Sequence, residues 1–114
     1  MTEAVSFDFL TFTVFVEMRD DVPDGFLDIA AGGCYDDPDT CKFGIWFKDP
    51  SPSCNMIVHE CWHLYMSLMS YIDHAPHTFE ELNSEIYAYS FQLLYGQVLD
   101  IIYNSKHYKA AEDV

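Results

Sequence analysis

The five residues at positions 59–63, His-Glu-Cys-Trp-His, constrain the fold of this chain more than any other stretch. They lie in a run without proline or glycine, which is typical of a helix. Residues four apart share one helix face, so His59 and His63 can reach the same ion. Glu60 then lies beside the open side of that ion, where a carboxylate can take a proton from bound water. Because two imidazoles leave a site incomplete, the pattern predicts a third ligand elsewhere.

Length and composition limit the class of protein to which this chain can belong. The chain has 114 residues, enough for one domain, and its 50% of hydrophobic residues indicates a globular rather than a disordered protein. We expect one domain over residues 1–105 and a polar, frayed tail over 106–114. No apolar run approaches the roughly 20 residues that span a bilayer. Since the N-terminus also lacks a signal-peptide pattern, the sequence predicts a cytoplasmic protein that does not enter a membrane.

The chain is strongly acidic. Its 19 acidic and 5 basic residues give a formal net charge of −14, which argues against direct binding of nucleic acid, because a phosphate backbone needs Lys and Arg. Acids confined to loops would serve solubility. Acids spread along one exposed face would instead imitate nucleic acid or dock on a basic partner, and both interpretations stay open.

The cysteines do not form a recognisable metal motif. They are Cys34, Cys41, Cys54 and Cys61, and no two of them make a C-x-x-C pair. A structural zinc ribbon is therefore not expected, and free thiols are the expected state without a secretory signal. A disulfide between Cys34 and Cys41 stays open. The acidic loop over 34–40 lacks the ligand spacing of a calcium loop.

Three segments predict strands. Residues 6–18 are rich in β-branched and aromatic residues and predict one strand that is covered on part of both faces. Residues 26–31 predict a second strand, paired with the first as a hairpin and ended by Gly32 and Gly33. Residues 42–48 predict a third strand, before the prolines at positions 50 and 52.

Two segments predict helices. The first helix should begin near Ser51 or Ser53 and run to about Ile72, carrying the two histidines. The second should run from about 79 to 103, with Thr78 and Glu81 forming a capping box at its start. The element order predicts an α+β fold, with a small, mainly antiparallel three-stranded sheet followed by two packed helices.

The second predicted helix offers the third metal ligand. Glu85 follows His63 by 22 residues, a spacing at which two antiparallel helices joined by a short loop can face each other. Zinc accepts a carboxylate oxygen as readily as an imidazole nitrogen. Ala88 is small and lies on the same helix face, which allows close approach, and Tyr89 on that face can hydrogen-bond a ligand.

Alternatives to this ligand set stay open. Glu80 and Glu81 also carry carboxylates in the same region, although the capping box explains Glu81 better. Cys61 lies about 200° round the helix from His59 and is expected to be a packed thiol. The two histidines could also be core residues that are hydrogen-bonded to nearby glutamates, in which case no metal would bind.

The motif pair resembles a known class of enzymes. H-E-x-x-H followed some twenty residues later by Glu-x-x-Ala is similar to the gluzincin class of zinc metallopeptidases, and the short chain resembles the minigluzincins. It is also similar to small phage-encoded proteins, which would act in the host cytoplasm. The resemblance covers about residues 42–95. It implies that His59, His63 and Glu85 hold Zn²⁺ and that Glu60 is the general base and proton shuttle.

The resemblance also implies a substrate site. A peptide or protein substrate would add to an edge strand at Phe43–Phe47. Larger members use a His or Tyr from another domain to stabilise the oxyanion, and here that residue must come from this short chain. We predict His77 and Tyr89 for this role, with His74 and Tyr87 as further candidates. The alternative function is an acidic interaction or inhibitor protein, which would be either a nucleic-acid mimic or a non-catalytic relative of the zincins that has kept the metal site.

Overall fold

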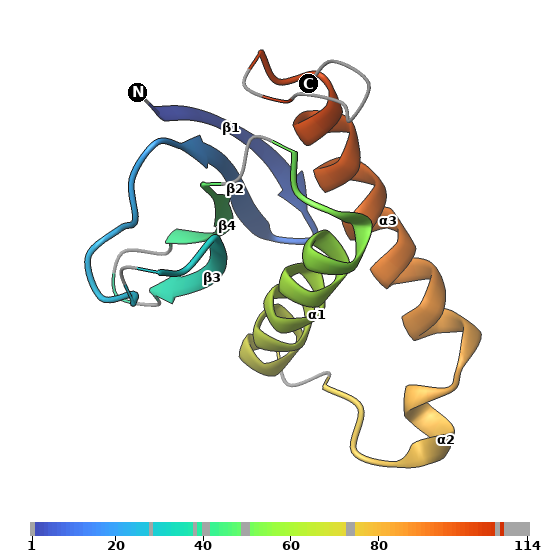
Figure 1. Ribbon diagram of the computed structural model, residues 1–114. Coiled ribbons are helices and arrows are strands. Elements are labelled where there is room, and N and C mark those ends of the chain that lie inside the picture. Colours follow the sequence, from blue (N-terminus) through green and yellow to red (C-terminus); the bar gives the residue numbers. More distant parts are fainter. Residues whose placement is uncertain are drawn as a thin grey trace.

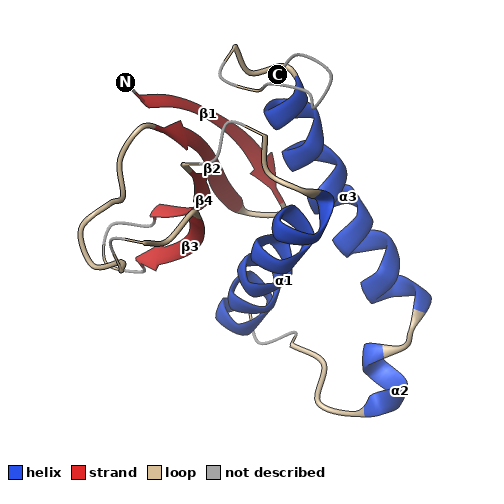
Figure 2. Cartoon of the chain, in the orientation of Figure 1, coloured by secondary structure: helices blue, strands red, loops and turns tan. Residues whose placement is uncertain are grey.

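The computed structural model describes residues 2–27, 29–37, 39, 42–48, 51–72, 75–106 and 108. Four strands come first and three helices follow (Figures 1 and 2). They are β1 (Thr2–Phe9), β2 (Phe12–Arg19), β3 (Gly32–Asp37), β4 (Lys42–Phe47), α1 (Cys54–Tyr71), α2 (Phe79–Leu82) and α3 (Glu85–Tyr103). The α+β class is confirmed. The sheet has four strands instead of the predicted three, and it is mixed, with two antiparallel pairings and one parallel pairing.

The strand order decides which backbone edges are open. The order is β1-β2-β4-β3, with β1–β2 and β3–β4 antiparallel and β2–β4 parallel. The prediction that Phe43–Phe47 forms an edge strand is wrong, because β4 pairs with β2 on one side and with β3 on the other. The two edge strands are β1 and β3.

The first predicted strand is in fact a hairpin. A two-residue turn at Leu10 and Thr11 divides it, so that Phe9 pairs with Phe12. Leu10 has a φ of 55°, a left-handed conformation that costs a non-glycine residue about 1–2 kcal/mol. The turn contains none of the usual turn residues. The long ladder between β1 and β2 sets the turn, which local sequence patterns cannot show.

The second predicted strand is wrong, and the glycines expected to end it begin β3. In the described part of 22–31 the chain forms turns rather than a strand. The Phe26 ring packs edge-on against the Trp46 ring, with centroids 5.1 Å apart. A Cβ at Gly33 would lie 2.7 Å from both the Phe26 ring and Trp46 Nε1, so Gly33 permits this close packing instead of ending a strand.

The core lies between one face of the sheet and the helices α1 and α3. Its fully buried members include Val14, Ile45, Phe47, Ile57, Leu64, Leu68, Leu94, Val98 and Ile102. The first predicted helix is confirmed, since Ser53 caps it by accepting a hydrogen bond from the Met56 backbone N–H at 3.1 Å. Figure 1 shows α1 and α3 crossing beside the sheet.

The second predicted helix is broken into α2 and α3 at Asn83 and Ser84. Ser84 caps α3, and Asn and Ser side chains compete for backbone groups, which favours such a break. The predicted Thr78 cap is present, as its hydroxyl accepts from the Glu81 N–H at 3.0 Å. The Glu81 carboxylate accepts from the His77 N–H at 2.9 Å.

Some predictions fall outside the described residues. These include the pairing of Cys34 with Cys41, a role for His74, and the state of most of the tail, since positions 41, 74, 107 and 109–114 are not described. Among the helices that are described, none is long and apolar enough to cross a membrane.

Candidate functional site

His59 and His63 lie on a solvent-exposed face of α1. The His59 side chain is 67% exposed, and His63 is exposed as well. Their Nε2 atoms are 3.3 Å apart and their ring centroids 4.8 Å apart. The alternative that they are core histidines is therefore wrong, and an ion from solvent can reach both rings.

The spacing of the two nitrogens fits a tetrahedral metal ion. With Zn–N bonds of about 2.0–2.1 Å, two ligand nitrogens on a tetrahedral zinc lie about 3.3–3.4 Å apart. The observed 3.3 Å between His59 Nε2 and His63 Nε2 matches this separation. Without a metal, the same distance suits a hydrogen bond from the N–H of one ring to the bare nitrogen of the other. The pair can thus supply two of the four positions around zinc.

Glu60 lies on the side of α1 that faces β3. Its side chain is 13% exposed and its Oε1 is 3.9 Å from His59 Nε2. Burial, and then the Glu60 charge, raise the pKa of the Cys34 thiol to about 11 and that of the Cys61 thiol to about 12. Both thiols therefore stay protonated at neutral pH, and Cys61 is fully buried, as predicted for a packed thiol.

The third predicted ligand does not join the histidine pair. Glu85 is the first residue of α3 and is exposed. Within the described part of the chain, no three His, Cys, Asp or Glu residues come together in a way that could hold a metal ion. The pair fits zinc, but the set of His59, His63 and Glu85 is not assembled in this arrangement.

The rotation of α1 about its axis explains this separation. Trp62 and Tyr65 form the side of α1 that meets α3: the Trp62 ring lies 5.5 Å from the Phe91 ring, and the Tyr65 hydroxyl is hydrogen-bonded to Ser90. His63 follows Trp62 by one residue, which turns it about 100° further round the helix. The histidines therefore face outward, between α3 and the edge of the sheet.

The residues predicted to stabilise an oxyanion lie on α3 and at the start of α2. Tyr89 is 63% exposed on α3, and His77 is exposed just before the Thr78 cap. The Tyr87 carbonyl accepts a hydrogen bond from the Tyr65 hydroxyl at 3.4 Å, which ties Tyr87 to α1 through its backbone. The roles of His77 and Tyr89 stay predictions.

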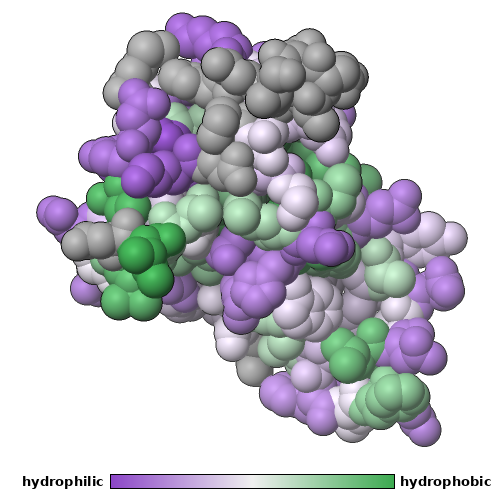
Figure 3. All heavy atoms as spheres, viewed as in Figure 1, coloured by the Kyte–Doolittle hydropathy of each residue, from purple (hydrophilic) through white to green (hydrophobic). Residues whose placement is uncertain are grey.

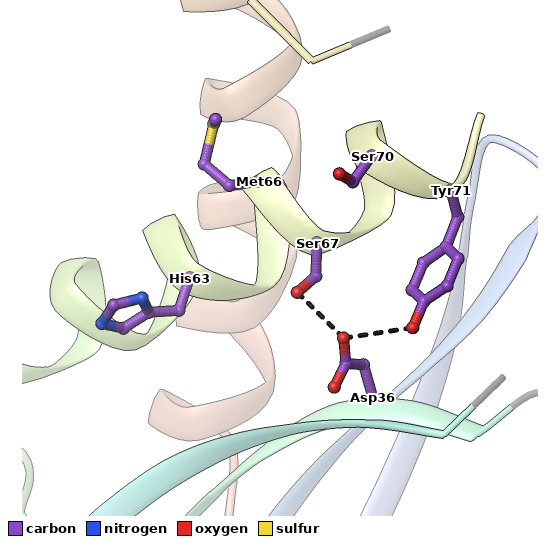
Figure 4. Close-up of a pocket in the computed structure, with 6 residues that line it drawn as sticks. All are labelled: Asp36, His63, Met66, Ser67, Ser70 and Tyr71. Carbon is purple, nitrogen blue, oxygen red and sulfur yellow. Dashed lines mark hydrogen bonds between the residues drawn. The ribbon is translucent and has the colours of Figure 1, made fainter. Parts of the chain in front are cut away.

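A hollow of about 530 Å³ opens between β3 and α1, beside His63 (Figure 4). Its described lining is Asp36, His63, Met66, Ser67, Ser70 and Tyr71. Asp36 Oδ2 accepts two hydrogen bonds, from Ser67 Oγ at 3.1 Å and from the Tyr71 hydroxyl at 3.3 Å. Loss of solvent, and then the Asp36 charge, raise the pKa of the Tyr71 phenol, so this hydroxyl stays a donor at neutral pH.

The sequence patterns missed Asp36 as a site residue because they placed it in a loop. In the structure Asp36 belongs to β3 and reaches the side chains of α1, whereas its neighbour Tyr35 lies near Gly44 within the sheet. The sequence of α1 does contain a pattern that could have indicated this polar site. Ser67 and Ser70 follow His63 by four and seven residues and continue its polar face.

Comparisons with protein-family models, with curated proteins and with solved structures give no match, so the functional assignment rests on the geometry of this chain.

Proposed function

We propose that the protein is a zinc-dependent metallopeptidase of the gluzincin type. The observation that carries this proposal is the 3.3 Å separation of His59 Nε2 and His63 Nε2 on an exposed helix face, which matches two ligand positions of a tetrahedral zinc. The neighbouring hollow supports it, because a substrate needs space beside the metal.

The chemistry divides between the metal and Glu60. Bound zinc would polarise a peptide carbonyl and make water a nucleophile near neutral pH. Glu60 would accept the proton of that water on its carboxylate and deliver it to the leaving amine nitrogen. The position of Glu60 supports this role. Its carboxylate lies beside His59, a proposed metal ligand, and is turned toward β3, where a substrate would bind, so it can carry a proton from the metal-bound water to the substrate.

We further propose that Glu85 is drawn in as the third ligand when the metal binds. The segment that carries it, residues 79–93, is here called the outer segment. None of its residues is buried, and the first buried residue of α3 is Leu94. The contacts of this segment with α1 lie at residues 87–91, so the part before them, which carries Glu85, can move at a small cost in free energy. Glu81 is less suited, because its carboxylate already caps α2 through the His77 N–H.

The substrate would bind along β3 rather than along β4. An edge strand presents unpaired backbone groups to which an extended peptide can add as a further strand. β3 is the edge strand next to the hollow, and its Asp36 forms part of the hollow's lining. A peptide on β3 would therefore pass close to His63 and Glu60.

Zinc binding and peptide hydrolysis test these roles separately. Wild-type protein should bind one zinc ion by elemental analysis, and His63→Ala should lose it. Glu85→Gln should weaken zinc affinity by about 10-fold or more, whereas the neighbouring Glu80→Gln should leave it unchanged. Glu60→Gln should retain zinc but lower the hydrolysis of a quenched fluorescent peptide pool by about 10²–10⁴.

Two results would reject this assignment. Wild-type protein that takes up no zinc would remove the metal site. Hydrolysis that survives Glu60→Gln at the wild-type rate would remove Glu60 as the base. Zinc affinity that is equal in wild type and Glu85→Gln would leave the histidine pair in place but exclude Glu85.

A second candidate function is favoured by the surface of the outer segment. Five of its large apolar side chains are exposed, namely Phe79, Leu82, Ile86, Tyr89 and Leu93, and Figure 3 shows apolar groups at the surface in this region. No Lys or Arg occurs between Lys48 and Lys106. An apolar surface with an acidic surround suits a basic amphipathic segment of a partner protein. Glu60→Gln should leave such binding unchanged.

A further inference from the structure

The hollow beside His63 contains a carboxylate held in a fixed orientation. Asp36 is the only carboxylate among the described lining residues. Both of its hydrogen bonds, from Ser67 and from Tyr71, go to Oδ2 (Figure 4). Oδ1 is left to accept from a ligand, because an ionised carboxylate has about four acceptor sites in all. The two hydroxyls therefore orient the group without neutralising it.

Among the described residues, no lysine or arginine is paired with this carboxylate. The ion pairs of Arg19 within the described residues are made with Glu17 and Asp21. Lys42 lies 5.7 Å from the ring centroids of Phe15 and Tyr35. Helix α1, which forms the other wall of the hollow, contains no Lys or Arg. A negative charge beside a cavity whose described lining contains no lysine or arginine favours a positively charged ligand.

The other lining groups suit a long cationic side chain. The Tyr71 ring offers an aromatic face to a cation, and it is held by an edge-on contact with Phe43, with centroids 5.3 Å apart. Met66 offers an apolar surface to the methylene stem, while Ser70 adds a hydroxyl. The volume of about 530 Å³ is within the range of ordinary ligand pockets.

We infer that this hollow binds an arginine or lysine side chain of a peptide, with Asp36 as the residue that selects for positive charge. The role of this binding in substrate selection rests on the proposed function, since the bound side chain would belong to a residue close to the cleaved bond. The binding itself does not require turnover. Asp36 would orient the substrate through Oδ1, and Ser67 and Tyr71 would be positioning residues that hold its other oxygen.

Binding of capped tripeptides tests the charge preference. N-acetylated, C-amidated Ala-Arg-Ala should bind wild-type protein about 10-fold more tightly than Ala-norleucine-Ala at low salt, by calorimetry, with amide shifts at Ser67 and Ser70 by NMR. Asp36→Asn should abolish the difference. Asp8→Asn is the matched control, because it removes the same charge from β1 at the opposite edge of the sheet, and it should preserve the difference.

The same titrations in 0.5 M salt and with further variants complete the test. High salt should weaken the Arg peptide more than the norleucine peptide. Tyr71→Phe, which keeps the ring but removes a donor to Oδ2, should cause a partial loss of about 2- to 3-fold. Equal binding of the two peptides, or an equal loss in Asp8→Asn and Asp36→Asn, would overturn the inference. A lack of zinc or of hydrolysis would reject the peptidase while leaving this charge preference measurable.

Discussion

The body of the molecule and its outer segment are built differently. In the body, the sheet packs against α1 and the C-terminal half of α3, and residues such as Leu64, Leu68 and Val98 have no exposed surface. In the outer segment, residues 79–93, no residue is buried and several large apolar side chains face solvent. Helix α3 is therefore packed into the core at its C-terminal end, whereas its N-terminal half is held by contacts of residues 87–91 with α1.

The proposed metal site joins these two regions. His59, Glu60 and His63 belong to α1 in the body, whereas Glu85 begins α3 in the outer segment. Ligands on a rigid element set the position of an ion, and a ligand on a weakly packed element can close over it later. Metal binding would then stabilise mainly the outer segment, because the body is already packed.

The largest expected effect comes from the same substitution made in each region. Leu64→Ala removes a fully buried side chain and should lower the free energy of unfolding by about 2–5 kcal/mol. Leu93 is 67% exposed, so Leu93→Ala should change the free energy of unfolding by less than about 0.5 kcal/mol. Urea denaturation followed by circular dichroism measures both. Similar losses in the two variants would contradict the division into body and outer segment.

A pH dependence should come from the buried thiol in the body. Burial raises the pKa of Cys61 from 9.0 to about 12, so folding favours the protonated thiol. This contribution is complete below pH 9 and is lost as the pH rises toward 12. Wild-type stability should therefore fall more steeply over this range than that of Cys61→Ala, as measured by urea denaturation at several pH values. Parallel curves would show that Cys61 ionises equally easily in both states.

The smallest expected effect compares two helix caps of the same chemistry. Ser53 caps α1 in the body and Ser84 caps α3 in the outer segment. Ser53→Ala should lower global stability by about 1 kcal/mol, because α1 unfolds only with the core. Ser84→Ala should leave the urea midpoint nearly unchanged and increase hydrogen exchange only at the start of α3. Equal shifts in the two midpoints would mean that the outer segment unfolds with the body.

Local patterns predicted the elements whose structure depends on nearby residues. The first helix, its Ser53 cap, the third strand and the Thr78 cap all depend on spacings of a few residues, and all are present. The hairpin turn at Leu10, the start of β3 at Gly32 and the break at Asn83 were missed. The turn at Leu10 and the start of β3 depend on pairing with strands that lie elsewhere in the sheet. The break at Asn83 depends on a balance between weak local preferences.

The sequence by itself determined the pairing of His59 with His63. Four-residue spacing on a helix places their nitrogens close together whatever the rest of the chain does, and the observed 3.3 Å reflects this. Only the tertiary structure decided which way that pair faces, that β3 rather than β4 is the open edge, and that Asp36 stands beside His63. The reason is physical: helix spacing is a local property, whereas helix rotation and strand order follow from burying Trp62, Tyr65 and the core against residues far away in the chain.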